Sequence, residues 1–98
     1  MEYNTKISSD ELDELFSAML LLKSKDDCYR FFEDICTISE IKAIAQRLCV
    51  ARMLDDKVTY QDISQKTGAS TATISRVNRC LQYGAGGYRL VLDRMKQD

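Results

Sequence analysis

Apolar residues recur at helical spacing through most of the chain, and no segment shows the alternation of a half-buried strand. Capping and turn residues divide this pattern into six segments. We predict helices at about 9–22, 25–35, 38–54, 60–67, 71–83 and 88–96. The sequence therefore predicts an all-α fold, and its length favours a single domain over residues 1–98.

The first and third segments have the widest apolar faces. A capping box of Ser8 and Glu11 opens the first, and one of Thr37 and Glu40 opens the third. A terminal helix as apolar as the first needs more than one covering surface, which favours a dimer. The third is predicted to be the central buried helix. The apolar positions are Leu12, Leu15, Phe16, Met19, Leu20 and Leu22 in the first, and Ile41, Ile44, Ala45, Leu48, Cys49, Ala51 and Leu54 in the third.

Two shorter segments are amphipathic. Their inward residues are predicted to be Cys28, Phe31, Phe32 and Ile35 in the segment 25–35, and Leu90, Val91 and Met95 in the last. We expect the last helix to dock on the core or on a partner. Mid-way along the segment 38–54, Arg47 interrupts the apolar pattern, as a surface arginine lying along a helix would.

Residues 59–83 predict a helix-turn-helix. Thr59 can cap its first helix, Gly68 stands where a helix ends in a left-handed residue, and Ser70 can cap the second. Four apolar residues fall where two crossing helices share a small core, as in DNA-binding motifs of this kind. They are Ile63, Ala69, Ile74 and Val77. A helical hairpin that touches no nucleic acid has the same pattern and remains an alternative.

The outward face of the second motif helix favours DNA as the partner. It offers small, hydroxylated and cationic side chains, and no Asp or Glu occurs from Thr67 to Gly87, while Arg76, Arg79 and Arg89 lie within or just after that stretch. We predict phosphate contacts from Thr59, Tyr60, Lys66, Thr73 and Arg79. For base-edge or water-mediated contacts we predict Ser70, Thr71, Ala72 and Ser75, and Arg76 suits a phosphate contact as well.

The charge is divided unevenly along the chain. The net charge is −1, but residues 1–36 carry nine acids and four bases, whereas residues 37–98 carry six acids and ten bases. This asymmetry suits a protein whose basic part faces DNA. No apolar run approaches the roughly 18 residues that span a bilayer, and the N-terminus lacks the apolar core of a signal peptide. We expect no membrane association and a cytoplasmic location.

The composition argues against metal and enzyme chemistry. The chain has four cysteines, no C-x-x-C pair and no histidine, so we predict that the cysteines pack as small hydrophobic residues. The glycines at 84, 86 and 87 follow no strand and precede no Lys-Ser or Lys-Thr pair, which indicates a helix stop. No motif supplies an activated nucleophile. We expect no metal, no cofactor and no catalytic site.

Residues 37–81 resemble the Trp repressor family, and more closely its YerC/YecD-like branch. The resemblance rests on Thr-Ile-Ser-Glu from Thr37, on Ala-Gln-Arg ending at Arg47, and on Gly-Ala-Ser-Thr-Ala-Thr-Ile-Ser-Arg ending at Arg76. It implies an intertwined homodimer that presents two recognition helices to successive major grooves of a near-palindromic operator. In this family two arginines sandwich the indole of the tryptophan corepressor. The resemblance places them at Arg47 and Arg76, and places Thr37 at the same ligand site.

Two positions depart from the tryptophan-binding pattern. Val77 stands where those repressors have a glycine beside the ring, and Cys80 where they have a serine near the ligand amino group. Overpacking costs about 1–3 kcal/mol, and a lost hydrogen bond to a charged group about 1.5–3 kcal/mol. We therefore expect that tryptophan does not act as corepressor. A small-molecule effector near Thr37, Arg47, Arg76, Val77 and Cys80 stays open.

Together these features predict a homodimeric, sequence-specific DNA-binding transcriptional regulator that acts as a repressor. One alternative keeps the helix-turn-helix but makes it an interaction module of a larger assembly, with weak or no specific DNA binding. Another is a purely structural dimerisation protein. Salt-dependent binding to one sequence far above random DNA separates the regulator from both.

Overall fold

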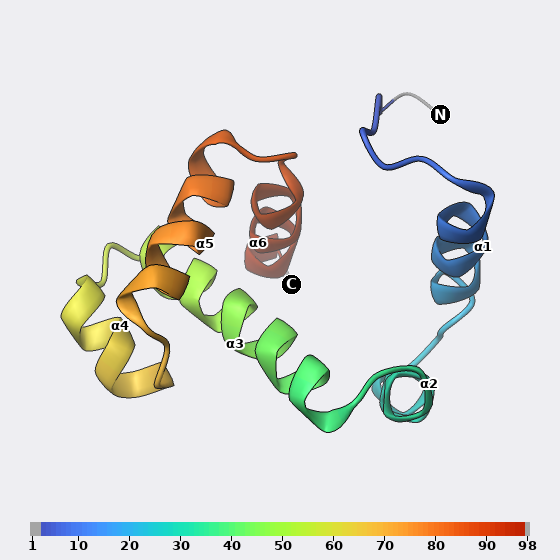
Figure 1. The fold of residues 1–98 in the computed structure, drawn as a ribbon, viewed down its shortest axis with the longest axis horizontal. Coiled ribbons are helices and arrows are strands. Elements are labelled where there is room, and N and C mark those ends of the chain that lie inside the picture. Colours follow the sequence, from blue (N-terminus) through green and yellow to red (C-terminus); the bar gives the residue numbers. More distant parts are fainter. Residues whose placement is uncertain (1–2, 98) are drawn as a thin grey trace. The chain divides into compact units, whose positions relative to one another are not determined.

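A computed structural model describes residues 3–97, and every regular element within them is an α-helix. The helices are α1 (Asp10–Met19), α2 (Lys25–Ile35), α3 (Ile38–Asp55), α4 (Tyr60–Thr67), α5 (Thr71–Tyr83) and α6 (Gly87–Gln97) (Figure 1). The predicted all-α class is confirmed, with all six helices found close to their expected ranges. Packing groups the chain into two compact units, Met1–Thr37 and Ile38–Asp98. The single domain stays a prediction.

The second unit holds the hydrophobic core. Figure 1 shows α4, α5 and α6 around the C-terminal half of α3, and each of the three packs against that helix. The buried side chains are Val50, Ala51, Ile63, Ala69, Ile74, Val77 and Leu92. The four apolar residues predicted to join the two motif helices are all among them. The core of this unit is therefore centred on the helix-turn-helix.

The first unit consists of α1 and α2. Ser9, not the predicted Ser8, caps α1: its Oγ accepts a hydrogen bond of 3.1 Å from the Leu12 amide. The helix ends at Met19 because the amides of Leu21 and Leu22 bond three residues back, to Ala18 and Met19, in a tighter turn. The apolar pattern that predicted helix as far as residue 22 runs on into this turn. Ser24 caps α2, since its Oγ accepts a hydrogen bond of 3.0 Å from the Asp27 amide.

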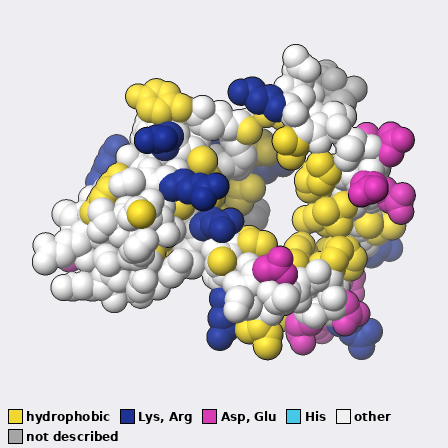
Figure 2. Space-filling model, in the orientation of Figure 1, with side chains coloured by type: hydrophobic (Ala, Val, Ile, Leu, Met, Phe, Trp, Pro, Cys, Tyr) yellow, Lys and Arg dark blue, Asp and Glu magenta, His cyan; other side chains and the backbone are white. Residues whose placement is uncertain are grey.

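Neither α1 nor α2 buries any residue fully. Phe31 and Phe32, predicted to point inward, are half-buried and meet edge to face with ring centroids 5.5 Å apart. Cys28 and Ile35, predicted beside them, are exposed. Figure 2 shows α1 with hydrophobic side chains along one side and acidic ones along another. The predicted apolar stripe of this helix is thus covered only in part: Phe16 and Leu20 are 50% and 86% exposed, while the others, Leu12, Leu15, Met19 and Leu22, are half-buried.

Three further predictions of burial were wrong. The N-terminal half of α3 is not buried: Ile44 and Ala45 are exposed, and the full burial falls on Val50 and Ala51. In α6 the buried residue is Leu92, whereas Leu90, Val91 and Met95, the predicted contacts, are exposed. The cysteines at 28, 49 and 80 are exposed and the one at 36 is half-buried, so they do not fill the core. Helical spacing identified an apolar stripe but not which part of it the single chain covers.

Candidate nucleic-acid interface

The first motif helix begins and ends as its sequence predicts. Thr59 Oγ1 accepts a hydrogen bond from the Asp62 amide at 3.2 Å and so satisfies one free amide of the first turn of α4. Gly68 ends the helix at φ +76°, and its amide donates to the carbonyl of Ser64 at 2.9 Å. Side chains rarely adopt this left-handed backbone, which is why a glycine stands there.

Side-chain hydrogen bonds hold the turn between α4 and α5. Thr67 Oγ1 donates to the Ile63 carbonyl at 2.7 Å and accepts from the Ala69 amide at 3.1 Å. Ser64 Oγ donates to the Ala69 carbonyl at 2.9 Å. From α3, Gln46 Nε2 donates to the Thr67 carbonyl at 3.1 Å. Because these groups are partly buried, the bonds fix the angle at which α5 leaves the turn. The sequence analysis missed all three of these donor side chains.

The predicted cap of α5 is also present. Ser70 Oγ accepts from the Thr73 amide at 3.1 Å and donates to Thr73 Oγ1 at 3.1 Å. These two hydroxyl groups therefore help to shape the helix N-terminus. The Thr73 hydroxyl still has its own proton to donate.

One face of α5 is buried and the other is open to solvent. Ile74 and Val77 enter the core, while Thr73 is half-buried. The exposed predicted contact residues are Thr59, Tyr60, Lys66, Ser70, Thr71, Ala72, Ser75, Arg76 and Arg79. Among residues 3–97, the cations of this group, Lys66, Arg76 and Arg79, form no ion pair with an acid. Figure 2 shows Lys and Arg side chains gathered on a face of this unit. The structure thus brings the candidate residues onto the solvent side of α4 and α5.

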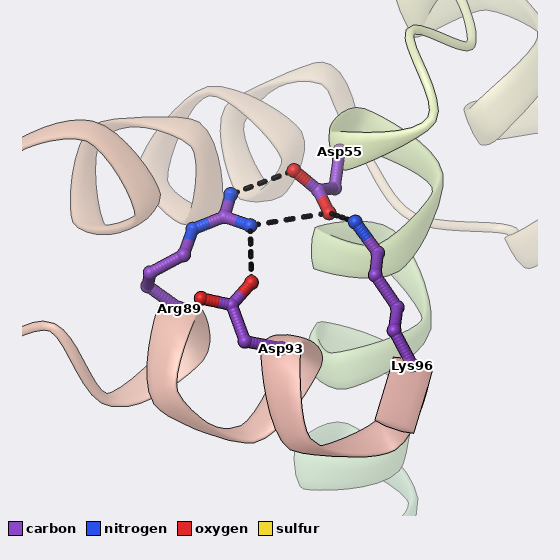
Figure 3. A network of polar contacts seen from close by, with 4 residues as sticks. All are labelled: Asp55, Arg89, Asp93 and Lys96. Carbon is purple, nitrogen blue, oxygen red and sulfur yellow. Dashed lines mark hydrogen bonds and ion pairs between the residues drawn. The ribbon is translucent and has the colours of Figure 1, made fainter. Parts of the chain in front are cut away.

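Arg89, the arginine just after the acid-free stretch, pairs with acids of α3 and α6. Its two terminal nitrogens donate to both oxygens of Asp55, at 2.6 and 3.3 Å, and one also reaches Asp93 at 3.1 Å (Figure 3). Lys96 Nζ donates to the same Asp55 carboxylate at 2.8 Å. The hydrogen bonds from Arg89 and Lys96 hold the pKa of Asp55 well below its ordinary value. Arg89 is therefore a link between α3 and α6 and not an unpaired cation.

The candidate effector residues lie in different surroundings. Arg47 and Cys80 line an open apolar groove of about 580 Å³ between α3, α5 and the start of α6. Arg76 does not line it, Val77 is buried at 3% exposure, and Thr37 is the last residue of the first unit. Tyr88, which the sequence analysis did not single out, lines the groove beside them. Burial raises the pKa of the Tyr88 hydroxyl.

The helix-turn-helix formed by α4 and α5 agrees with the comparison to known proteins. A family model described as Trp repressor protein matches residues 10–96. The chain belongs to the Trp repressor family. It is therefore a helix-turn-helix protein of a transcription-regulator family, and that family is not one of enzymes.

One curated relative and two solved structures are similar to nearly the whole chain. The protein YerC of Bacillus subtilis, whose function is uncharacterised, is 58% identical over 94% of this chain and 88% of its own length. A crystal structure of a TrpR-like protein from Eubacterium eligens has a TM-score of 0.90 at 54% identity, covering 95% of this chain and 96% of that one. A candidate Trp repressor from Staphylococcus aureus has a TM-score of 0.89 at 50% identity, covering 95% and 93%. The predicted family and branch are thus confirmed.

Over residues 3–97, no helix combines the length and the apolar character needed to cross a membrane. In the same part of the chain, no three Cys, Asp or Glu side chains gather as metal ligands would.

Proposed function

We propose that this chain is a sequence-specific DNA-binding transcriptional regulator that acts as a homodimeric repressor. The observation that carries the proposal is the exposed face of α5, with short polar side chains and two unpaired arginines, Arg76 and Arg79, on a helix anchored by a buried opposite face. No carboxylate occurs from Thr67 to Gly87 to repel a phosphate backbone. A rigid helix with such a face suits the major groove of DNA.

The proposed DNA contacts fall into two groups, those to phosphates and those to base edges. Thr59 and Tyr60 stand at the start of α4, where backbone amides face outward, and Lys66 and Arg79 supply charge to phosphates. The Thr73 hydroxyl, which accepts from Ser70, donates its own proton to a phosphate oxygen. Ser70, Thr71, Ala72 and Ser75 are too short to span far, so they contact base edges closely or through water. Arg76 reaches either a phosphate or a base.

A homodimer completes the first unit in this proposal. The apolar stripe of α1 and the rings of α2 are only partly covered in the single chain, and a second copy would complete their cover. Two-fold symmetry then directs the two recognition helices to the halves of a near-palindromic operator. Binding there represses by blocking access to a promoter. We place its action in the cytoplasm, because its relatives come from bacteria, whose DNA lies there.

Tryptophan has no evident place in this regulator. Val77 occupies the position of the ring-contacting glycine, and its side chain is part of the packed core together with Ile74. A flat ring beside it would have to displace core contacts. We therefore propose that operator binding does not require tryptophan.

Selection of genomic fragments by the purified protein, at physiological salt with and without tryptophan, tests the proposal. Enrichment of one near-palindromic sequence under both conditions is the expected result. Enrichment with tryptophan alone would show that Val77 and Cys80 still permit a corepressor. The absence of any enriched sequence would instead favour an interaction module of a larger assembly.

Variants at matched arginines test the proposed face. We expect Arg79→Ala to weaken operator binding and to reduce the slope of log K against log salt by about 0.9 for one lost phosphate contact. Arg94→Ala, an exposed arginine on α6, serves as the control and should leave the slope unchanged. Equal effects of the two substitutions would contradict the assignment of α5 as the DNA-contacting helix.

A further inference from the structure

The Asp55 carboxylate connects two turns of α6 to the end of α3. It receives both terminal nitrogens of Arg89 and the ammonium of Lys96, which lies seven residues further along the helix. Leu92, buried at 1% exposure, lies between the two cations on the same side of α6. Figure 3 shows Arg89 and Lys96 reaching the carboxylate from opposite ends of this helix face. The Asp55 side chain itself is only 14% exposed.

Apolar packing alone does not define how α6 is rotated. At about 100° per residue, Tyr88, Val91 and Met95 flank Leu92 on one side, and Arg89, Lys96 and Asp93 flank it on the other. Val91 and Met95 remain 43% and 39% exposed. A roll of the helix by about 60° would bury more of this apolar flank while still leaving Leu92 near the core. Hydrophobic contact is non-directional, so it permits both settings.

The ion pairs of Asp55 distinguish between the two rotations of α6 because, unlike apolar contacts, they are directional. The guanidinium fork fits a carboxylate only in a narrow geometry, and a roll toward the apolar flank would draw Arg89 and Lys96 away from Asp55. Tyr88 and Val91 line the groove that also contains Ile44, Leu48, Arg47 and Cys80. The same roll would therefore move apolar side chains into this groove and fill it.

We propose that Asp55 is a positioning residue: its ion pairs with Arg89 and Lys96 set the rotation of α6 and hold open the groove between α3, α5 and α6. The network selects one of two apolar packings and governs access to Arg47 and Cys80 in the groove. This role concerns the groove alone and does not depend on DNA binding.

The accessibility of Cys80 reports the state of the groove. A background of Cys28→Ser, Cys36→Ser and Cys49→Ser leaves Cys80 as the single thiol, and its alkylation by iodoacetamide can be followed by mass spectrometry. If Asp55→Asn shifts about nine tenths of the molecules to the closed setting, the rate falls about tenfold. The matched control is Asp56→Asn, because this neighbouring acid is exposed and outside the network. Asp55→Glu should restore much of the rate.

A second variant removes the partners of Asp55 that lie on α6. The double substitution Arg89→Gln with Lys96→Gln removes both cations and should slow alkylation as Asp55→Asn does, with the helical circular dichroism retained. In both variants the nuclear Overhauser effect between the methyl groups of Val91 and Ile44 should strengthen. An unchanged rate would overturn the proposal, as would a Cys80 already protected in the wild-type background. A faster rate would also overturn it, because it would mean that the network merely tethers α6.

Discussion

At the scale of single residues, helix-capping preferences explain most of the hydrogen bonds seen at the helix ends. Ser24, Thr59 and Ser70 each cap a helix through a hydroxyl that accepts a hydrogen bond from the amide three residues later. The caps at Thr59 and Ser70 were predicted from the sequence. The exception is Lys57, which adopts φ +65° between α3 and α4. Its amide bonds to the Leu54 carbonyl and that of Val58 to the Met53 carbonyl, which closes α3 in a left-handed cap normally made by glycine.

This cap leads to the first prediction. A side chain in the left-handed region costs about 1 kcal/mol or more, whereas glycine adopts it freely at some cost in unfolded-chain entropy. We expect Lys57→Gly to raise the free energy of unfolding by roughly 0.5 kcal/mol, measured by urea denaturation. Lys57→Ala removes the charge but keeps the Cβ, so it should give no gain. Equal stabilisation by both variants would attribute the effect to charge and not to backbone strain.

At the scale of elements, α6 shows why a stripe of apolar residues does not determine burial. The apolar pattern predicted Leu90, Val91 and Met95 as inward residues, yet Leu92 is the buried one, and Arg89 and Lys96 on its other flank pair with Asp55 of α3. Asp55 lies at the end of α3 and its partners lie 34 and 41 residues later, so no local pattern reveals the pairing. A separation of 21 residues likewise hid the contact of Gln46, whose side chain donates to the Thr67 carbonyl and supports the turn after α4.

The second prediction concerns the pH dependence of this link. Because the pKa of Asp55 is lowered on folding, its contribution to stability is fully present above the ordinary carboxyl value of about 4 and is lost as the pH falls below it. We expect the free energy of unfolding to decrease more steeply from about pH 4 downward in the wild type than in Asp55→Asn. Urea denaturation of both proteins across this range provides the measurement. Parallel curves would show that the ion pairs do not form in solution.

At the scale of the whole molecule, the two units differ in how much of their hydrophobic surface each buries by itself. Ile38–Asp98 has a buried core, whereas α1 and α2 bury no residue fully. The acidic balance of residues 1–36 and the basic balance of residues 37–98 follow a nearly identical boundary. A second copy of the chain would supply the missing cover under the proposed function.

The third prediction tests this cover. Leu20 is 86% exposed in the single chain, so Leu20→Glu should be harmless to a monomer. If α1 packs on a second copy, the substitution buries a charge at that contact and should shift the protein toward a species of 11.2 kDa in sedimentation equilibrium. Ser17→Glu, an exposed polar position on the same helix, is the control and should not change the mass. A wild type that sediments as a monomer would contradict the proposed homodimer.

The sequence by itself determined the features that depend on neighbours in the chain. Helical periodicity, hydroxyl caps and a left-handed glycine are local, so the six helices, the helix-turn-helix and the small core of Ile63, Ala69, Ile74 and Val77 could be predicted. So could the exposed face of α5, because burial of one face of a helix leaves the other in solvent.

Only the tertiary structure decided what depends on residues distant in the chain. It showed that Arg89 is paired with Asp55 and that Val77 is packed in the core, while Arg47 and Cys80 share a groove with Tyr88. It also showed that α1 buries none of its residues fully. The spacing of apolar residues indicates that a helix face is buried, but not which element covers that face. The charge pattern along the sequence indicates whether a surface is acidic or basic, but not which charged side chains already form ion pairs. Those answers come from packing between helices.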